Sequence, residues 1–343
     1  MRIGIPKELK DSEFRVSMTP AGVRELVAHG HDVAVERNAG AGSSFPDAEY
    51  VAAGASIVDD PDALWSRSEL ICKVKEPISD EHHRLRRDLV LFTYLHLAAS
   101  EPCTRALLDA GTTAIAYETV QRADGSLPLL APMSEIAGRL APIVGAEHLQ
   151  RQNDGRGVLM GGIPGVRPAR VVVIGAGVAG AAAAAIAVGM HAEVAAIDRD
   201  IDRLRTLDAI YRGQLGTIAS SAYAIEQACL DADLVIGAVL VVGARAPRLV
   251  SDALVEQMRP GSVLVDIAID QGGCFESSRP TTHSAPTFRV ANSIFYCVAN
   301  MPGGVPHTST HGLTNVTLPY AIAIADHGWR VAAARNEALA HGV

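Results

Sequence analysis

The feature of this sequence that most constrains its fold is a glycine-rich loop between a strand-like and a helix-like segment. The loop follows the β-branched run 171–174, precedes an alanine-rich run, and carries Gly175, Gly177 and Gly180 in the spacing G-x-G-x-x-G. Glycines at these places allow a tight turn, a close approach of backbone to a pyrophosphate, and close packing of helix on strand. Asp198 ends the next predicted strand, about 20 residues further on, where an acidic residue contacts a ribose. Because the flanking strand and helix are present, dinucleotide binding is favoured over an ordinary glycine-rich turn.

The residues around Asp198 bear on which dinucleotide binds. A carboxylate there accepts hydrogen bonds from ribose hydroxyls and repels a 2′-phosphate, which favours NAD over NADP. Arg199, Arg203 and Arg205 lie close by in the sequence and could favour NADP instead. We interpret Arg199 and Arg205 as a solvated helix face.

The rest of the chain alternates strand-like and helix-like segments. Such a β-α rhythm predicts parallel, doubly wound sheets. A break at residues 121–133 and a long helix that follows it divide the chain, and a final helix is expected to return to the first part. Strands are predicted at residues 2–5, 31–36, 70–74, 89–93, 113–116, 170–174, 193–197, 234–237 and 262–267, helices at 21–30, 48–54, 63–68, 101–111, 134–151 and 318–339, and loops at 155–168 and 301–310.

Composition excludes several classes of protein. The 38 acidic residues outnumber the 30 basic ones, giving a net charge of −8, and no basic run is present, so we expect no nucleic-acid partner. No apolar stretch reaches the roughly 18 residues of a spanning helix, so we expect no membrane role. Five cysteines without CxxC spacing argue against a disulfide scaffold or a structural zinc site and fit a reducing cytoplasm.

Three titratable residues of the first part follow predicted strands or lie in loops. These are Arg15, Lys75 and His96. Singly, they read as a surface arginine, a strand-end lysine and a loop histidine. Together at one end of a parallel sheet they would suit a small anion, because arginine clamps a carboxylate in bidentate fashion, lysine polarises a carbonyl and histidine exchanges a proton near neutral pH.

Two aspartates fall in the apolar segment 262–270. We interpret this segment as a buried parallel strand whose carboxyl end carries Asp270, and ligands of open α/β sheets bind beyond such ends. Asp270 is therefore the better candidate for a site. Asp266 could be a hydrogen-bonded structural carboxylate.

Ordered blocks follow one another along nearly the whole chain: Gly4-Ile5-Pro6-Lys7-Glu8, Glu13-Phe14-Arg15-Val16, Lys73-Val74-Lys75-Glu76-Pro77, Phe92-Thr93-Tyr94-Leu95-His96-Leu97-Ala98, Ala131-Pro132-Met133-Ser134-Glu135, the glycine loop, and segments 265–273, 278–282 and 296–302. Together these blocks resemble the alanine dehydrogenase family, which is related to the NAD-binding subunit of transhydrogenase. The resemblance implies an α/β fold of two doubly wound domains. In it an NAD-binding Rossmann domain, residues 129–305, is inserted into a discontinuous substrate domain, residues 1–128 and 306–343.

The resemblance also implies roles for individual residues. His96 would be the general acid/base, assisted by Asp270 beside the nicotinamide, while Arg15 and Lys75 bind the substrate and Met133 and Asn300 line its pocket. Besides the three loop glycines and Asp270, the positions that match cofactor contacts are Ser134, Val178, Ala179, Asp198, Arg203, Ser220, Val239, Leu240, Ile267, Arg279, Val298 and Met301.

The activity implied by the resemblance is reversible conversion of L-alanine, water and NAD into pyruvate, ammonium and NADH by a cytoplasmic homohexamer. Amination of glyoxylate is an expected side activity. Two alternatives stay open: an NAD(H)-binding subunit of a proton-translocating transhydrogenase, and a non-catalytic NAD-binding protein.

Two positions depart from the family pattern. Arg203 stands where members often have lysine beside the adenosine ribose, which keeps the charge but changes hydrogen-bond geometry. Ala323 stands where some members have a glutamate that binds magnesium together with a histidine four residues on, here His327. We therefore expect no metal site.

Overall fold

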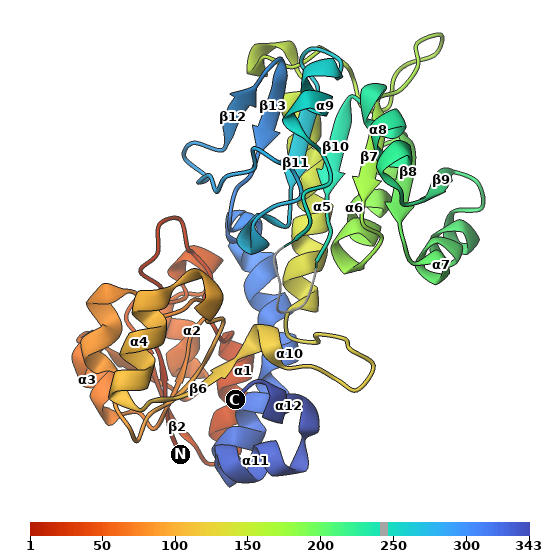
Figure 1. Cartoon of the computed structure of the whole chain (residues 1–343). Coiled ribbons are helices and arrows are strands. Elements are labelled where there is room, and N and C mark those ends of the chain that lie inside the picture. The colour runs from red at the N-terminus through yellow and green to blue at the C-terminus, as the bar shows by residue number, and fades with distance from the viewer. Residues whose placement is uncertain (241–245) are drawn as a thin grey trace. The chain divides into compact units, whose positions relative to one another are not determined.

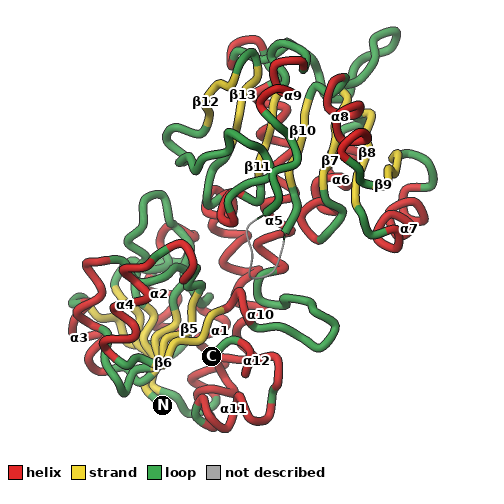
Figure 2. Tube along the Cα trace, in the orientation of Figure 1, coloured by secondary structure: helices red, strands yellow, loops and turns green. Residues whose placement is uncertain are grey.

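The chain folds into two compact α/β units. The computed structural model describes residues 1–240 and 246–343. Unit 1 comprises Met1–Met133 and Pro302–Val343, and unit 2 comprises Ser134–Met301. Figures 1 and 2 show the strands gathered into two sheets with helices around each. Among the residues that the structure describes, no helix is both long and apolar enough to cross a membrane.

Unit 1 contains a six-stranded parallel sheet in the order β3-β2-β1-β4-β5-β6. Its chain order switches between β1 and β4, so the loops after β1, β4 and β5 meet at one edge of the sheet. Its strands are β1 (Arg2–Ile5), β2 (Asp32–Glu36), β3 (Ser56–Val58), β4 (Leu70–Cys72), β5 (Val90–Thr93) and β6 (Thr113–Ala116), and its helices α1 (Pro20–Ala28), α2 (Asp47–Ala52), α3 (Pro61–Arg67), α4 (Glu101–Ala110), α10 (Pro306–His327), α11 (Trp329–Arg335) and α12 (Glu337–His341).

Local signals explain several of these helices. Thr19 caps α1 by accepting a hydrogen bond from the Gly22 amide, and Pro20 starts the helix with its φ already set. Asp60 with Pro61 does the same for α3. In α4 the left-handed residue Gly111 ends the helix.

The predicted loop 301–310 and final helix 318–339 are wrong in their bounds. Helix α10 begins at Pro306 and runs through Pro319 to His327. Gly328, at φ +75°, then turns the chain into α11, and the Asn336 side chain caps α12. The predicted return to the first part is confirmed, because the Ala116 amide of β6 donates to the Gly342 carbonyl at 2.7 Å.

Unit 2 contains a seven-stranded sheet in the order β12-β13-β11-β10-β7-β8-β9, parallel except for the edge strand β12. Chain order switches between β7 and β10, the position at which doubly wound sheets bind ligands. Helix α5 (Ala131–His148) begins in the last three residues of the first segment of unit 1 and continues into unit 2. The other elements of unit 2 are β7 (Arg170–Ile174), α6 (Val178–Gly189), β8 (Glu193–Asp198), α7 (Ile201–Tyr211), β9 (Leu215–Ala219), α8 (Ala222–Leu230), β10 (Leu234–Gly237), α9 (Asp252–Gln257), β11 (Val263–Asp266), β12 (Thr287–Val290) and β13 (Ser293–Tyr296).

Strand β7 is buried on both faces, as its β-branched run predicts. Val171 and Val173 belong to one hydrophobic cluster, whereas Val172 and Ile174 belong to another on the opposite face. Continuous apolar strands of this kind are typical of parallel sheets covered by helices on both sides. The predicted fold class, two doubly wound α/β units with a Rossmann-type unit inserted into a discontinuous one, is confirmed.

Candidate functional sites in the two units

The loop after β1 holds Arg15 at the carboxyl edge of the unit 1 sheet. Its backbone is fixed on both sides of the arginine, since Ser43 donates to the Phe14 carbonyl at 2.9 Å and the Val16 amide donates to Thr310 at 3.2 Å. Arg15 is only 2% exposed. Its guanidinium donates from Nε and Nη2 to the Glu13 carboxylate, at 2.7 and 2.5 Å, and from Nη1 to the Met133 sulfur at 3.1 Å.

The segment that carries Lys75 is held by a buried group of charges beneath it. Lys73 is 0% exposed and donates from Nζ to Glu8 at 3.2 Å and to Glu81 at 2.8 Å. Glu8 also accepts from the Val74 amide at 2.7 Å. Burial opposes the charge of Lys73, but the two carboxylates raise its pKa above the ordinary value.

Lys75 itself is buried, and its backbone carbonyl accepts a hydrogen bond from Thr93 at 2.9 Å. This bond joins the end of β4 to the end of β5. The next residue after β5, Tyr94, donates its hydroxyl to the Leu129 carbonyl at 2.6 Å. Burial raises the pKa of Tyr94, so the phenol stays protonated.

His96 lies three residues after β5, in a left-handed conformation at φ 47°. Such a conformation is uncommon for a residue other than glycine and needs support from its surroundings. Glu118, which follows β6, supplies it by accepting from the His96 amide at 2.6 Å and from the Leu95 amide at 3.1 Å. The imidazole stacks on the Tyr94 ring, with the two centroids 6.0 Å apart.

Three of the predicted residues, Arg15, Lys75 and His96, therefore lie in loops at one edge of the unit 1 sheet, and Met133 of α5 contacts the first of them. Arg15 contacts Met133 directly, Lys75 is joined to β5 through Thr93, and His96 follows on that strand. The sequence interpretation assigned no role to Glu13, Tyr94 or Glu118. Glu118 follows a parallel strand at the same edge, so the reasoning that selected Lys75 and His96 could have found it.

Unit 2 carries the glycine loop between β7 and α6. Gly175 has φ +102°, and a Cβ on Gly180 would lie 1.7 Å from the Gly175 carbonyl oxygen. Gly177 caps α6 without a side-chain acceptor. The loop thus presents helix N-terminal amides, which favour an anion such as a phosphate.

Asp198 lies at the end of β8, as predicted, and supports this loop. One carboxylate oxygen accepts from the Ala176 amide at 2.6 Å and the other from the Asp200 amide at 2.8 Å. Arg203 faces it, with Nη1 3.8 Å from the Asp198 carboxylate. The amide of the predicted cofactor contact Ser220 donates to the Asp198 carbonyl at 2.9 Å.

Two predicted apolar contacts flank the switch point of the unit 2 sheet and are exposed. Val178, the first residue of α6, is 50% exposed, and Leu240, after β10, is 45% exposed. Val239 lies beside Leu240, and a Cβ on Gly175 would come within 3.1 Å of its side chain. The residues after β10 and the glycine loop therefore meet here and leave apolar surface exposed.

The remaining predicted residues of unit 2 are more dispersed. Arg279 lies over the Phe288 ring of the edge strand β12, 4.4 Å from its centroid, and β13, β11 and β10 separate that strand from β7. The Asn300 carbonyl accepts from His283 at 2.9 Å. Val298 and Met301 are buried, Ile267 and Ser134 are partly buried, and Ala179 is in the first turn of α6.

The predicted strand 262–270 is wrong at its carboxyl end. Strand β11 ends at Asp266, and Asp270 is an exposed residue of the short 3-10 turn η6 (Ile269–Gln271). Asp266 ends the strand because its buried carboxylate accepts from the Ala268 amide at 3.1 Å, the Cys274 amide at 2.7 Å and the Ser278 hydroxyl at 2.5 Å. The structural role considered for Asp266 agrees with these contacts.

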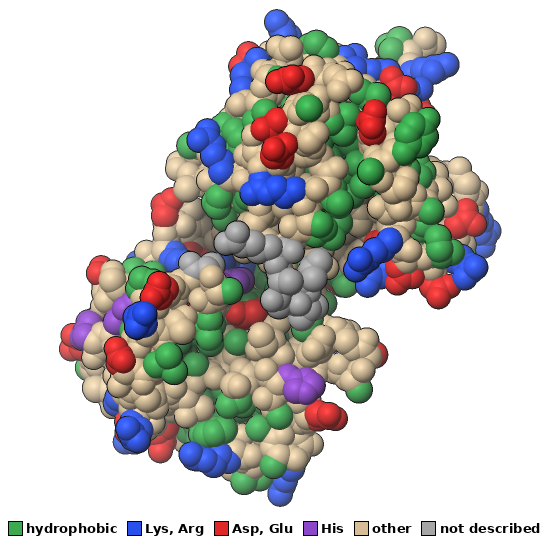
Figure 3. Space-filling view, in the orientation of Figure 1, with side chains coloured by type: hydrophobic (Ala, Val, Ile, Leu, Met, Phe, Trp, Pro, Cys, Tyr) green, Lys and Arg blue, Asp and Glu red, His purple; other side chains and the backbone are tan. Residues whose placement is uncertain are grey.

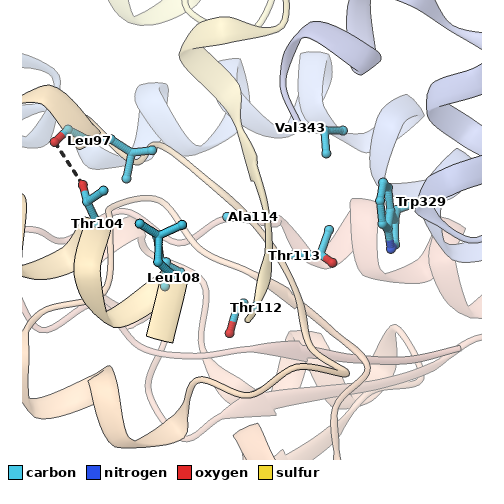
Figure 4. A pocket seen from close by; sticks show the side chains of 9 residues that line it. Leu97, Thr104, Leu108, Thr112, Thr113, Ala114, Trp329 and Val343 are labelled. Carbon is cyan, nitrogen blue, oxygen red and sulfur yellow. Dashed lines mark hydrogen bonds between the residues drawn. The ribbon is translucent and has the colours of Figure 1, made fainter. Parts of the chain in front are cut away.

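Figure 4 shows a pocket of about 310 Å³ in unit 1 that is lined differently from the sheet edge. Leu97 and Leu108 line one side, and Trp329 and Val343 lie across from them. Leu107 also lines the pocket. None of the lining side chains is titratable, so this pocket is unsuited to acid–base chemistry. In the space-filling view of Figure 3, basic and acidic side chains are scattered among apolar and uncharged ones over the visible surface of the described residues.

Two family models together match most of the chain. The model described as the N-terminal domain of alanine dehydrogenase/PNT matches residues 4–137, and the one for the C-terminal domain matches residues 141–343. Over all of this chain and 92% of each relative, the sequence is 63% identical to an alanine dehydrogenase of Mycobacterium tuberculosis (strain H37Rv) and 54% identical to one of Halomonas elongata.

Solved structures give a consistent picture. The chain is similar to a structure titled L-alanine dehydrogenase, with a TM-score of 0.95 and 51% identity over 100% of this chain and 94% of that one. It is also similar to a transhydrogenase from Sinorhizobium meliloti, with a TM-score of 0.82 and 27% identity over 95% of each chain.

Proposed function

The chain belongs to the alanine dehydrogenase/PNT family, and we propose that it is an NAD-dependent L-alanine dehydrogenase. The reaction converts L-alanine, water and NAD reversibly into pyruvate, ammonium and NADH. The observation that carries the proposal is 51–63% identity along the whole chain to proteins named alanine dehydrogenase. Arg15, Lys75 and His96, at or near one sheet edge, supply the groups that such a reaction needs.

The residues of unit 2 fit NAD. The amides at the start of α6 suit its pyrophosphate, the Gly175 and Gly180 positions leave no room for side chains, and Asp198 suits a ribose diol. Ser134, Arg203, Ser220, Val239, Leu240, Ile267, Asp270, Arg279, Val298 and Met301 are proposed as further contacts. When bound, NAD accepts the hydride of the alanine Cα or NADH returns one to the substrate carbon.

In unit 1, Arg15 and Lys75 hold and polarise the substrate. The guanidinium of Arg15 binds the carboxylate shared by alanine and pyruvate, and Lys75 contacts the carboxylate or the carbonyl oxygen. Met133, on the Nη1 side of Arg15, and Asn300 are proposed to line the pocket. Binding both ends of a three-carbon acid orients it before the chemistry begins.

His96 moves the protons. In the direction of amination, attack of ammonia on pyruvate gives a carbinolamine whose hydroxyl leaves as water, and that hydroxyl needs a proton from an acid. In deamination the same imidazole accepts a proton from the attacking water. Glu118 and Tyr94 hold the histidine backbone and ring where these transfers occur, and Asp270 is proposed to assist.

The test is to mix the purified chain with pyruvate, ammonium and NADH and to follow the loss of NADH absorbance. We expect oxidation that needs all three components, and reduction of NAD when L-alanine replaces them. NADPH should be the poorer cofactor because Asp198 repels a 2′-phosphate. No oxidation between about pH 7 and 10, a range above the ordinary pKa of histidine, would contradict the proposal.

The alternative, an NAD(H)-binding subunit of a proton-translocating transhydrogenase, rests on the 27% identical structure. The alanine dehydrogenases are much more similar over the same length, so we favour the enzyme. Alanine turnover by the isolated chain distinguishes the two.

Assembly and side activity are further parts of the proposal. By family membership we propose a homohexamer, which light scattering would detect as six times the 36.0 kDa chain mass. Glyoxylate should replace pyruvate at a lower rate, with glycine as the product.

A further inference from the structure

The guanidinium of Arg15 already has a carboxylate partner in this structure. Glu13 accepts from Arg15 Nε at 2.7 Å, from Nη2 at 2.5 Å and from the Arg15 backbone amide at 3.0 Å. Glu13 is 6% exposed and Arg15 is 2% exposed. Glu13 therefore occupies the side edge of the guanidinium, one of the two edges that bind carboxylates in bidentate fashion.

The surroundings oppose separation of this pair. Burial acts against the charge of Arg15, yet the Glu13 carboxylate raises the pKa of Arg15 above its ordinary value. A carboxylate that left Arg15 would lose its bonds to the guanidinium while inside the protein, which is costly. A substrate carboxylate that took the same edge would have to displace Glu13 from those bonds.

The Nη1 side of Arg15 has a different neighbour. There the Met133 sulfur accepts at 3.1 Å. A thioether is a weak acceptor, and methionine is flexible, so a carboxylate can take its place at little cost. Glu13 and the Met133 sulfur thus differ in how readily a substrate carboxylate can replace them.

From these contacts we infer that Glu13 is a positioning residue, which keeps the Nε–Nη2 edge of Arg15 and directs the substrate carboxylate to the Nη1 side, in place of the Met133 sulfur. The inference rests on the proposed function and adds to it the side of Arg15 on which substrate binds. The competing account makes Glu13 a resident competitor that substrate displaces.

The two accounts predict opposite effects of Glu13→Gln. If Glu13 positions Arg15, the amide holds the guanidinium less firmly, and KM for pyruvate rises about 10- to 100-fold, the range for losing one hydrogen bond to a charged group. The kcat should change less than about threefold, because binding is lost equally in ground and transition states. Glu13→Asp, which keeps the charge, should lie between the variant and the wild type.

A fall in KM, or no change, would overturn the inference. Glu101→Gln is the matched control, because Glu101 pairs with Arg105 on the exposed surface of α4 and its loss should leave KM unchanged. NADH affinity, which depends on unit 2, should not move in any variant. If the wild type makes no alanine, the proposed function fails instead, so the two failures are distinguishable.

A crystal structure of the wild-type protein with pyruvate and NADH tests the same point without a substitution. We expect the Glu13–Arg15 pair to remain, with the pyruvate carboxylate near Nη1. Pyruvate on the Nε–Nη2 edge, with Glu13 turned away, would overturn the inference.

Discussion

The carboxyl edges of the two sheets are built from different kinds of residue. In unit 1 the edge is built from buried charges, with Lys73 between Glu8 and Glu81 and Arg15 paired with Glu13. In unit 2 the edge is built from glycines and helix N-terminal amides, and Asp198 holds the loop. A three-carbon acid has little surface beyond its charges, so side-chain charges must select it, whereas a dinucleotide needs space and backbone donors.

The substitution expected to distinguish the roles of the two units most strongly is His96→Ala. Removing the acid/base should lower turnover by about 10²- to 10⁴-fold, while NADH binding, measured by fluorescence titration, stays unchanged. His83→Ala is the control, since His83 is an exposed histidine of the same unit that pairs with Asp62. Retained turnover, or loss of NADH binding together with turnover, would contradict the assignment of acid/base chemistry to unit 1 and of NADH binding to unit 2.

The reciprocal change is Gly180→Ala in unit 2. The new Cβ would lie 1.7 Å from the Gly175 carbonyl, so the loop must move and NADH affinity should fall at least about tenfold, as a displaced phosphate contact implies. Gly189→Ala, in the same helix with nothing within 4 Å of its Cβ position, should leave affinity unchanged. Equal NADH affinities in the two variants would contradict the proposed phosphate site at the glycine loop.

Lys73→Met tests whether the buried charges of unit 1 depend on one another. The substitution leaves Glu8 and Glu81 buried without a cation, and the free energy of unfolding should fall by about 3–5 kcal/mol. Chemical denaturation followed by circular dichroism measures it. Arg105→Met removes an arginine from an exposed pair and should change little; an equally small effect at Lys73 would refute the dependence.

The smallest expected effect concerns His31, away from both sites. Its Nε2 lies 2.8 Å from Asp326, and its Nδ1 lies 3.3 Å from the N-terminal amine. Burial and the N-terminal amine lower the pKa of His31, and Asp326 offsets part of this shift. Below pH 6.5 the unfolded chain therefore binds a proton at His31 more readily than the folded chain does. The free energy of unfolding consequently decreases as the pH is lowered. His31→Gln should make this loss shallower in melting curves between pH 5 and 7.5, and His29→Gln, on the other Asp326 oxygen, is the comparison.

The sequence predicted the two sheets because parallel strands carry continuous apolar runs, and it located Asp198 at a strand end because the glycine loop sets that distance. It missed Glu118, whose bonds to Leu95 and His96 span 23 and 22 positions, although Glu118 follows a strand of the same parallel sheet as Lys75 and His96 do. It also placed the carboxyl end of β11 at Asp270 instead of Asp266, because an apolar run does not reveal the backbone bonds that the Asp266 side chain accepts.

Helix bounds near the end of the chain were also wrong. Pro306 lies in the predicted loop 301–310, yet it begins α10, and Pro319 lies inside that helix. The predicted unit boundaries at residues 128/129 and 305/306, and the separate roles of the two units, stay predictions.

The central claim is that hydride passes between the cofactor and the Cα of alanine. The most direct measurement incubates the protein with pyruvate, ammonium and NADH deuterated at both C4 positions, and analyses the product by proton NMR and mass spectrometry. The account predicts L-alanine carrying one deuterium at Cα. Unlabelled alanine, or NADH consumption without alanine, would contradict it.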